Sequence, residues 1–577
     1  MRKSIVLTAI LLAGFGVNSL FAQNPAPGTA DATAGDLDSL KARISDQQAQ
    51  IRKLQQAVDD QQKLLDRALQ SMASAQPAKG TAKTGDGTAV VETATTNVAA
   101  PVRLIPALGG RPYPLTNAQK DSNDTSESPC VEGNPSPTFI RIGNACIIPI
   151  GFMDLTALWR DKNAGSSIGS NFGSVPYNNT TNAQNSEFRF SPQNSRIGFR
   201  VDGNWKGTHF IGYNEFDFLG TSGATNIGVT NGAFVPRLRL FWVDARKGKV
   251  EFLAGQSWSM LTPNRSGISA LPGDLFYSQV IDVNYMAGLT WTRQPGMRVL
   301  FHPDHKVTFG FSVENPDQYM GGSAGGSTAT LPAALTGLAA TQLDNGGTIG
   351  TANTVLTTPT ESPDLIAKVA FDPSSRFHFE VAGVESRFKI WNPNTGSAPG
   401  AGQHFSATGG GVQVGLNGAI TKNFRLLTTN YWSDGGGRYL FGQAPDVVVR
   451  ANGALSPVHS GGTVDGFEAT IKNTLLYAYY GGILIERNVA IDATGKPVGY
   501  GYSGSPASQN RAIQEATFGF NQTIWKNPRY GAINLMGQYE YLTRDPWAVA
   551  SGAPKATHDN TVYFNVRYSL PGSMPVF

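Results

Sequence analysis

The sequence has few cysteines, few charged residues and, beyond its N-terminus, no long hydrophobic run. Two cysteines among 577 residues exclude a disulfide-rich scaffold and a zinc ribbon. Charged residues make up 15% of the chain and the net charge is only +4, so the charge does not indicate nucleic acid binding. No internal stretch approaches the roughly 18 apolar residues that a membrane-spanning helix requires. The chain is nevertheless far too long for one ordinary soluble core.

Motifs for catalysis and metal binding are also missing. Neither GxSxG nor HExxH occurs, and no Ser–His–acid arrangement can be assigned. His302 and His305 flank the Pro303–Asp304 pair, where a role in a turn is favoured over a metal site. The other histidines are scattered along the chain: His209, His378, His404, His459 and His558. The sequence therefore predicts that the protein is not an enzyme and binds no cofactor or metal.

The N-terminus carries an export signal. Residues 1–22 begin with Arg2 and Lys3, continue with an apolar run over residues 5–17, and end at Ala22 before a polar segment. This order is typical of a cleaved secretory signal peptide. A membrane anchor is the alternative, but the apolar run is short.

Residues 36–72 show the one long helical pattern. Apolar residues recur at every seventh position, and a second series contains leucine, glutamine and alanine, which together predict a coiled coil of five heptads spanning on the order of 50 Å. The first series is Leu37, Ile44, Ile51, Val58, Leu65 and Met72; the second is Leu40, Gln47, Leu54, Gln61 and Ala68. The coiled coil predicts self-association of unspecified number, with a lone amphipathic helix as the alternative.

The composition of residues 73–138 predicts a flexible linker followed by a segment rich in proline, serine and asparagine that precedes the next domain. Cys130 and Cys146 lie near its end. In an exported protein these two cysteines are expected to form one structural disulfide.

Residues 186–219 read as two strands joined by a tight turn. Ile197, Phe199 and Val201 share one face of the first strand, while Arg196 and Arg200 share the other. A soluble sandwich would bury the apolar face, whereas a transmembrane barrel would turn it to lipid and the arginines to a water-filled lumen.

The alternation continues through residues 139–577 and favours the barrel. Tight turns such as GNWKG and HPDHK alternate with long loops, of which residues 316–363 are the longest, as in outer-membrane barrels. The predicted fold is therefore an all-β transmembrane barrel of 16 antiparallel strands, preceded by the α-helical coiled coil. The strands are expected at residues 147–160, 186–201, 209–219, 237–245, 249–260, 289–302, 306–314, 364–371, 376–391, 404–419, 424–432, 463–472, 474–486, 512–525, 530–542 and 560–570.

A barrel of this size leaves an aqueous channel, so function depends on what narrows and charges it. Residues 261–288 are too apolar for a solvated loop and are expected to fold inward as a constriction that carries Arg265, Asp274 and Asp282. The lumen face is expected to add Arg196, Arg200, Arg237, Arg239 and Arg298, while Arg293 requires a bulge to join them. Neighbouring guanidiniums would concentrate anions. The alternative is that they pair with wall carboxylates and merely fill a polar lumen.

The motifs QNSRIGFR, GQSWSML and WTRQPGMR, together with the heptad segment and the linker, resemble the DcaP-like porins of Gram-negative outer membranes. The resemblance implies a trimeric porin in the outer membrane, with its N-terminal coiled coil in the periplasm, that passes small anions, notably dicarboxylates. It assigns Arg196, Arg200, Gln256 and Arg298 to matching motifs. The C-terminus departs from these porins, whose last strand normally ends in an aromatic residue. Here the terminal Phe577 follows Pro571, Gly572 and Pro575. A phosphate-selective or weakly selective porin, or a barrel that tethers the envelope, remains an alternative.

Overall fold

The computed structural model describes residues 139–143, 145–220, 234–275, 279–322, 325–346, 358–393, 402–527 and 529–571, with Ser45, Ala49 and Gln56 as isolated helical residues. The chain divides into two units, residues 1–99 and 100–577, and the barrel belongs to the second. The predicted signal peptide, the linker and the rest of the predicted coiled coil lie outside the described residues. Cys146 is disulfide-bonded, whereas Cys130, its predicted partner, also lies outside them.

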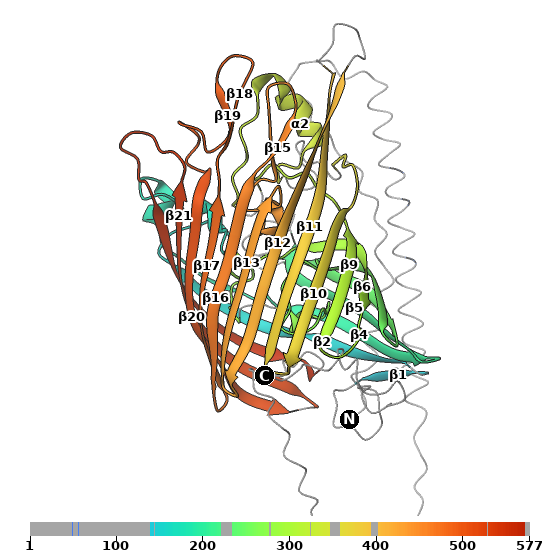
Figure 1. The fold of residues 1–577 in the computed structure, drawn as a ribbon. Helices are drawn as coiled ribbons and strands as arrows, with labels where there is room; N and C mark the ends of the chain where they lie inside the picture. The colour runs from blue at the N-terminus through green and yellow to red at the C-terminus, as the bar shows by residue number, and fades with distance from the viewer. Residues whose placement is uncertain are drawn as a thin grey trace, which may run out of the picture. The chain divides into compact units, whose positions relative to one another are not determined.

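An 18-stranded sheet closes on itself into a barrel (Figure 1). The wall runs through β2 (Ala145–Arg160), β4 (Arg196–Trp205), β5 (Thr208–Gly220), β6 (Val235–Lys247), β7 (Val250–Trp258), β8 (Arg293–Phe301), β9 (Val307–Glu314), β10 (Asp364–Ser374), β11 (Phe377–Asn392), β12 (Gln403–Thr421), β13 (Phe424–Asp434), β16 (His459–Ile471), β17 (Thr474–Ile485), β20 (Asn510–Asn527), β21 (Gly531–Pro546) and β22 (Thr557–Ser569). Each pairs antiparallel with its neighbours, and β22 pairs with β2 to close the ring. The two remaining strands of the sheet, β1 (Ile140–Ile142) and β3 (Glu187–Ser191), are short and pair with β2.

All sixteen predicted strands are confirmed, because side-chain alternation marks both faces of the wall. On β22 the side chains of Val562, Phe564 and Val566 are exposed on the outer face, while Thr561 and Asn565 are buried on the inner face. The largest difference from the prediction concerns the strand expected at residues 186–201, which the structure divides into β3 and β4 with a break over residues 192–195. β8 also starts later than expected, at Arg293 rather than residue 289. Trp291 instead donates its backbone N–H to the carbonyl of Tyr439, at 3.0 Å, and so belongs to the interior of the barrel.

The two ends of the barrel differ. At one end, which we call the turn rim, short turns join β4 to β5, β6 to β7, β8 to β9, β10 to β11, β12 to β13, β16 to β17 and β20 to β21. At the other end, the loop rim, long connections carry α2 (Thr336–Gln342) and two small hairpins, β14 (Val447–Val449) with β15 (Leu455–Pro457) and β18 (Asn488–Ile491) with β19 (Pro497–Tyr500). Among the described residues, no helix is long and apolar enough to span a bilayer.

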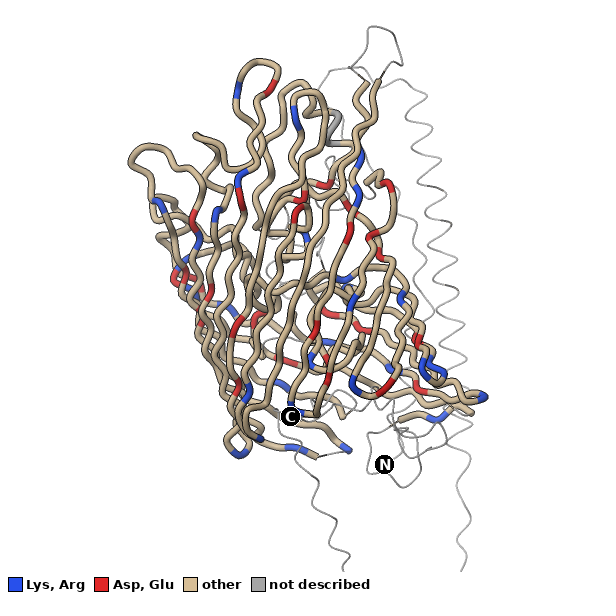
Figure 2. Tube along the Cα trace, viewed as in Figure 1, with Lys and Arg blue, Asp and Glu red and all other residues tan. Residues whose placement is uncertain are grey.

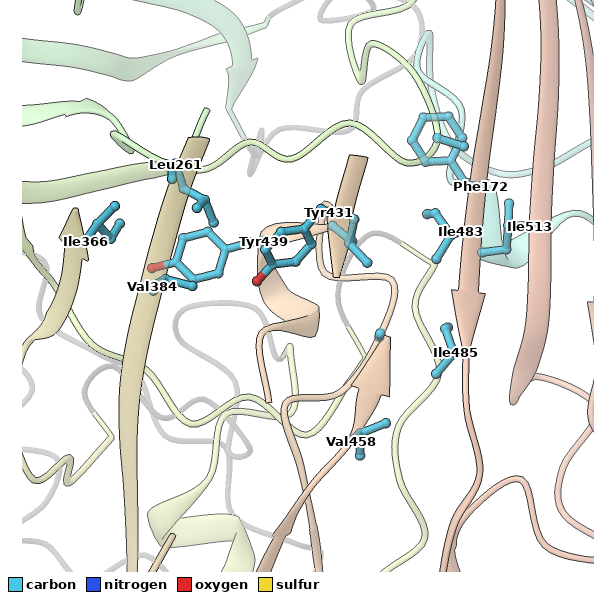
Figure 3. Close-up of a cluster of buried hydrophobic side chains, with 14 of the residues drawn as sticks. Phe172, Leu261, Ile366, Val384, Tyr431, Tyr439, Val458, Ile483, Ile485 and Ile513 are labelled. Carbon is cyan, nitrogen blue, oxygen red and sulfur yellow. The ribbon is translucent and has the colours of Figure 1, made fainter. Parts of the chain in front are cut away.

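The main hydrophobic core forms where loops fold against the inner wall. Leu261, Phe172 and Tyr439 come from three different loops and pack with wall residues (Figure 3). The wall contributes Ile366 of β10, Val384 of β11, Ile483 of β17 and Ile513 of β20. These contacts position the loops that shape the interior.

Candidate pore-lining site

Residues 259–275 and 279–292, which we call the central loop, lie between β7 and β8 and cross the interior of the barrel. Their backbone N–H groups donate to side chains on distant strands, which fixes the path of the loop across the lumen. The donors and acceptors are Met260 to Glu314 (2.8 Å), Asn264 to Glu380 (3.1 Å), Gln279 to Tyr479 (3.0 Å), Ile281 to Gln538 (2.7 Å) and Ala287 to Glu515 (2.8 Å).

Two ion-pair contacts reinforce this path. Arg265 of the central loop pairs with Glu468 of β16 at 2.8 Å. The Lys368 Nζ of β10 donates to the carbonyl oxygen of Thr262 at 2.9 Å and pairs with Glu380 at 2.8 Å, and both charged side chains are fully buried. Arg265 therefore anchors the loop and is not exposed in an open channel as a separate charge.

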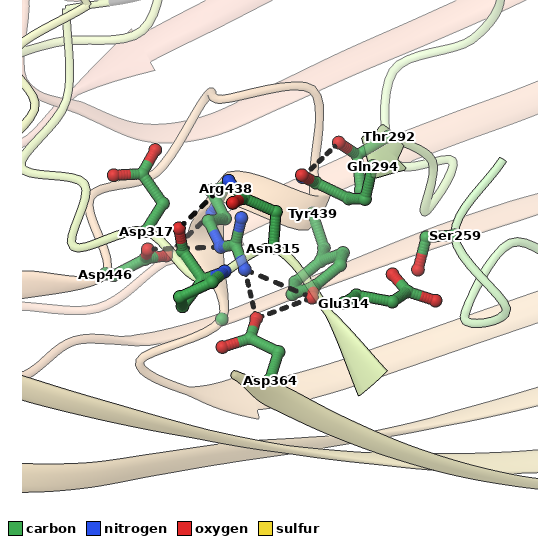
Figure 4. Close-up of polar contacts among 12 residues, drawn as sticks. Ser259, Thr292, Gln294, Glu314, Asn315, Asp317, Asp364, Arg438, Tyr439 and Asp446 are labelled. Atoms are coloured by element: carbon green, nitrogen blue, oxygen red, sulfur yellow. Dashed lines mark hydrogen bonds and ion pairs between the residues drawn. The ribbon is translucent and has the colours of Figure 1, made fainter. Parts of the chain in front are cut away.

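A second loop, residues 435–458 between β13 and β16, packs against the central loop from the side of the loop rim. Arg438 donates to the Asp364 carboxylate, and the hydroxyl of Tyr439 donates to the same carboxylate at 2.7 Å (Figure 4). This anchoring brings Phe441 onto Trp291, with ring centroids 4.7 Å apart. The interior on this side is thus packed with aromatic rings.

The central loop meets a group of arginines near the loop ends of β4, β5, β6 and β8. Arg239 lies at its centre: it donates to Glu215 at 2.7 Å, to Asp217 at 2.7 Å and to the Tyr285 hydroxyl at 3.0 Å. Its side chain is only 3% exposed. Arg239 therefore ties two wall carboxylates to the central loop.

Arg196 and Arg237 flank Arg239. Arg196 donates to the hydroxyl of Tyr285 at 3.2 Å and lies 3.6 Å from Glu215. Arg237 forms a two-pronged contact with Asp217 at 3.0 and 2.7 Å, and its side chain is 39% exposed. Arg237 has the largest exposed fraction of its side chain in this group.

Arg293 completes the group from the first residue of β8. Its guanidinium carbon lies 5.6 Å from the ring centroid of Trp258, as does that of Arg239, so the two cations share one indole. Among the described residues, the Nη1 of Arg293 has no hydrogen-bond partner although it is buried.

We call Arg196, Arg237, Arg239 and Arg293 the arginine cluster. Four guanidiniums contact or face only two carboxylates, Glu215 and Asp217, among the described residues, which leaves a local excess of two positive charges. Such an excess attracts anions and repels cations.

Gln256 does not lie in the lumen, contrary to the expectation from its motif. The register places it on the same face of β7 as Val250 and Phe252, which are exposed on the outer wall. At this position Gln256 contacts a β-bulge. Glu215 and Phe216 of β5 pair with Leu240 and Leu238 of β6, so Arg239 is an extra residue of β6 without a partner in the pairing. The Gln256 Nε2 donates to the carbonyl of Arg239 at 2.8 Å.

Replacement of Gln256 by leucine is expected to destabilise the barrel by about 1–2 kcal/mol, because the bulge carbonyl would lose its donor in apolar surroundings. Urea unfolding in lipid vesicles measures this change. Gln514→Leu is the matched control, since Gln514 accepts a hydrogen bond from the Tyr480 side chain and contacts no bulge. Equal losses in the two variants would contradict a role for Gln256 at the bulge.

The remaining expected residues have other partners. Arg200 donates to Asp202 on the same strand, and Arg298 donates to the Ser257 hydroxyl at 2.6 Å. Asp274 and Asp282 shape loops: Asp274 accepts from the Ser269 hydroxyl at 2.8 Å, and Asp282 accepts the backbone N–H of Ser170 at 3.0 Å. The structure therefore brings these four residues into the interior but not into the arginine cluster.

Glu215, Asp217 and Trp258 also belong to this site, although they are not among the residues predicted from the sequence. The two carboxylates have a signal in the sequence, because they share the inner parity of β5 and face Arg237 and Arg239 across a strand pair. The hydroxyl of Tyr285 has no such signal in the sequence, because its position depends on the path of the central loop. Among the described residues, no group of three or more histidine, cysteine or acidic side chains is arranged to hold a metal.

No protein-family model and no curated protein sequence matches the chain. Among solved structures, the outer-membrane channel DcaP of Acinetobacter baumannii aligns with a TM-score of 0.53 and 17% identity, over 75% of this chain and 99% of that one. The chain has the barrel fold of the DcaP channel. The resemblance inferred from sequence motifs is thus confirmed for the fold.

Two other barrels align less closely. An anion-selective porin from Comamonas acidovorans has a TM-score of 0.41 at 12% identity, over 74% of this chain and 99% of that one. OmpF of Salmonella typhi has a TM-score of 0.41 at 9% identity, over 75% of this chain and 100% of that one.

Proposed function

We propose that this protein is a DcaP-like porin of a Gram-negative outer membrane, through which small anionic solutes diffuse past the arginine cluster. Dicarboxylates are the expected class of solute, because guanidiniums offer paired donors to carboxylates. The observation that carries the proposal is the excess of two positive charges where the central loop meets the wall. The barrel fold shared with the DcaP channel supports it.

The proposal includes the assembly of the chain. The predicted signal peptide directs export, the heptads of residues 36–72 form a periplasmic coiled coil, and the barrels associate as a homotrimer. The porin works without enzymatic activity and without a cofactor. Arg196, Arg237, Arg239 and Arg293 are the residues assigned to selectivity.

The reversal potential of purified protein in a planar bilayer under a KCl gradient tests this function. We expect a stable conductance with the sign of an anion-selective pore. A cation-selective conductance would retain the porin and overturn the arginine mechanism. Absence of conductance from folded protein would overturn the porin and favour a barrel that only tethers the envelope.

Phosphate would use the same guanidiniums as a dicarboxylate. Competition separates the two: succinate and phosphate are added in turn at equal ionic strength, and the chloride current is recorded. Stronger block by succinate is the expected result. Stronger block by phosphate would move the proposal to a phosphate-selective porin.

A further inference from the structure

The turn rim is lined by exposed cations. Every turn that joins two wall strands at this end carries at least one lysine or arginine, and these residues appear as a row of blue segments at the lower edge of the barrel in Figure 2. The exposed cations are Lys206, Lys247, Lys249, Lys306, Arg376, Lys422, Lys472, Lys526 and Arg529.

The described turns contain few acidic residues, and these have structural partners. Asp304 accepts the backbone N–H groups of Lys306 and Val307 at 2.7 and 3.0 Å, and these bonds hold the pKa of Asp304 below its usual value. Asp372 accepts the N–H of Gly267 at 2.9 Å and pairs with His378 at 3.0 Å. The acids thus complete turns, and in the described turns they are fewer than the cations of the row.

Turn geometry does not explain the lysines. Lys206 and Lys472 adopt φ values of 49° and 54°, in the left-handed region where glycine or asparagine is favoured. Lysine is therefore unfavourable for the backbone conformation at two separate turns. We infer that its positive charge, and not its conformational preference, accounts for its presence there.

Large apolar side chains lie directly beside these cations on the outer wall. Trp205, Trp525 and Tyr530 are exposed, and the Nζ of Lys206 lies 4.8 Å from the ring centroid of Trp205. Phe301, Phe371, Phe377 and Ile471 are exposed at the same ends of their strands. Aromatic rings with cations at their polar edge are typical of the level of lipid head groups.

The loop rim has no comparable row in its described part. Its exposed cations are mixed with acids, as in the pairs of Arg387 with Glu385 at 3.1 Å and Arg511 with Asp545 at 3.7 Å. The positive charge at the turn rim is therefore a feature of one end of the barrel.

We propose that the cations of the turn rim bind the head groups of anionic phospholipids in the leaflet that surrounds this end. The inference rests on the proposed function only in that the barrel must sit in a bilayer. The lysines reach from the aromatic level to the phosphates, and each turn contributes one or two contacts. This ring of contacts would hold the turns at the membrane surface and fix the depth of the barrel.

Lipid selectivity measured by electron paramagnetic resonance tests the proposal. Wild-type protein is placed in phosphatidylcholine vesicles with spin-labelled phosphatidylglycerol or spin-labelled phosphatidylcholine, and the fraction of label at the protein surface is compared. We expect about a threefold preference for phosphatidylglycerol at low salt, which falls towards unity in 1 M NaCl because charges are then screened.

The test variant replaces one lysine in each of five turns: Lys206→Gln, Lys247→Gln, Lys422→Gln, Lys472→Gln and Lys526→Gln. Its preference should fall below about 1.5-fold. The matched control removes five exposed cations at the loop rim: Arg387→Gln, Arg450→Gln, Lys496→Gln, Arg511→Gln and Lys555→Gln. The control should retain the wild-type preference, and a heat-modified shift on gels confirms that each barrel is folded.

Two results would overturn the proposal: no preference in the wild type, or equal loss in the two variants. Binding to isolated peptidoglycan without any lipid preference would assign the rim to an acidic polymer instead. Conductance is measured separately. If the protein conducts but shows no lipid preference, only the proposal of lipid binding at the turn rim is refuted. If it prefers anionic lipid but does not conduct, only the proposed porin function is refuted.

Discussion

The double substitution Arg237→Gln with Arg293→Gln is expected to abolish most of the anion preference of the pore. It removes two of the four guanidiniums while Glu215 and Asp217 remain, so the local excess of positive charge falls from two to zero. A unit charge close to a permeating ion contributes on the order of 1 kcal/mol. The chloride-to-potassium permeability ratio should therefore fall roughly tenfold, as measured from reversal potentials.

These two arginines are chosen because the wall tolerates their loss. Arg239 is buried against both carboxylates, and its removal would take the closest ion-pair partner from Glu215 and leave Asp217 with Arg237 alone, at a cost of about 3–5 kcal/mol. Arg237 is the most exposed of the four, and Arg293 contacts Trp258. A change in selectivity in this variant would thus report charge and not unfolding.

Two controls sharpen the measurement. Arg237→Lys with Arg293→Lys preserves both charges and should retain most of the anion preference. Arg387→Gln removes an exposed arginine whose ion pair with Glu385 lies outside the arginine cluster, and it should leave the permeability ratio unchanged. If the double glutamine variant keeps its selectivity, the arginines pair with wall acids only to fill a polar lumen.

The fold could be predicted because a barrel wall is encoded locally. Ile197, Phe199 and Val201 share one face of their strand by alternation alone, and once the wall is a barrel their parity places Arg196 and Arg200 on the inner face. The same argument holds for each strand in turn, so the sixteen strands follow from short stretches of sequence.

The site could be predicted only in part, because its geometry depends on contacts between distant segments. Arg265 meets Glu468 across more than two hundred residues, and Tyr285 reaches Arg239 only after the central loop has crossed the lumen. The role of Gln256 could not be inferred either, since a bulge at Arg239 changes which carbonyl needs a donor. Alternation identifies faces, but it does not identify partners.

Replacement of Lys368 by methionine is expected to release the central loop and raise the single-channel conductance. Lys368 donates to the carbonyl oxygen of Thr262 and to the Asn264 side chain, both at 2.9 Å, and it neutralises the buried Glu380. The substitution leaves that carboxylate with His378 as its remaining basic neighbour, 3.2 Å away. The free energy of unfolding should fall by about 3 kcal/mol.

The double variant Lys368→Met with Glu380→Gln separates the effect of the unpaired carboxylate from the effect of the hydrogen bonds that Lys368 makes to the central loop. It removes the unpaired carboxylate, so it should recover part of the lost stability while the conductance stays high, because the bonds from Lys368 to the loop remain absent. Urea unfolding and single-channel recording provide the two values.

Arg567→Met is the matched control for this prediction. Arg567 pairs with Asp154 on the inner wall at 2.8 Å, and neither residue contacts the central loop among the described contacts. This variant should lose stability without any gain in conductance. If both variants raise the conductance equally, the inner wall as a whole determines the width of the channel. If Lys368→Met lowers stability alone, the central loop is held by its other anchors, foremost the pair of Arg265 with Glu468, and the constriction must then be sought by releasing that pair.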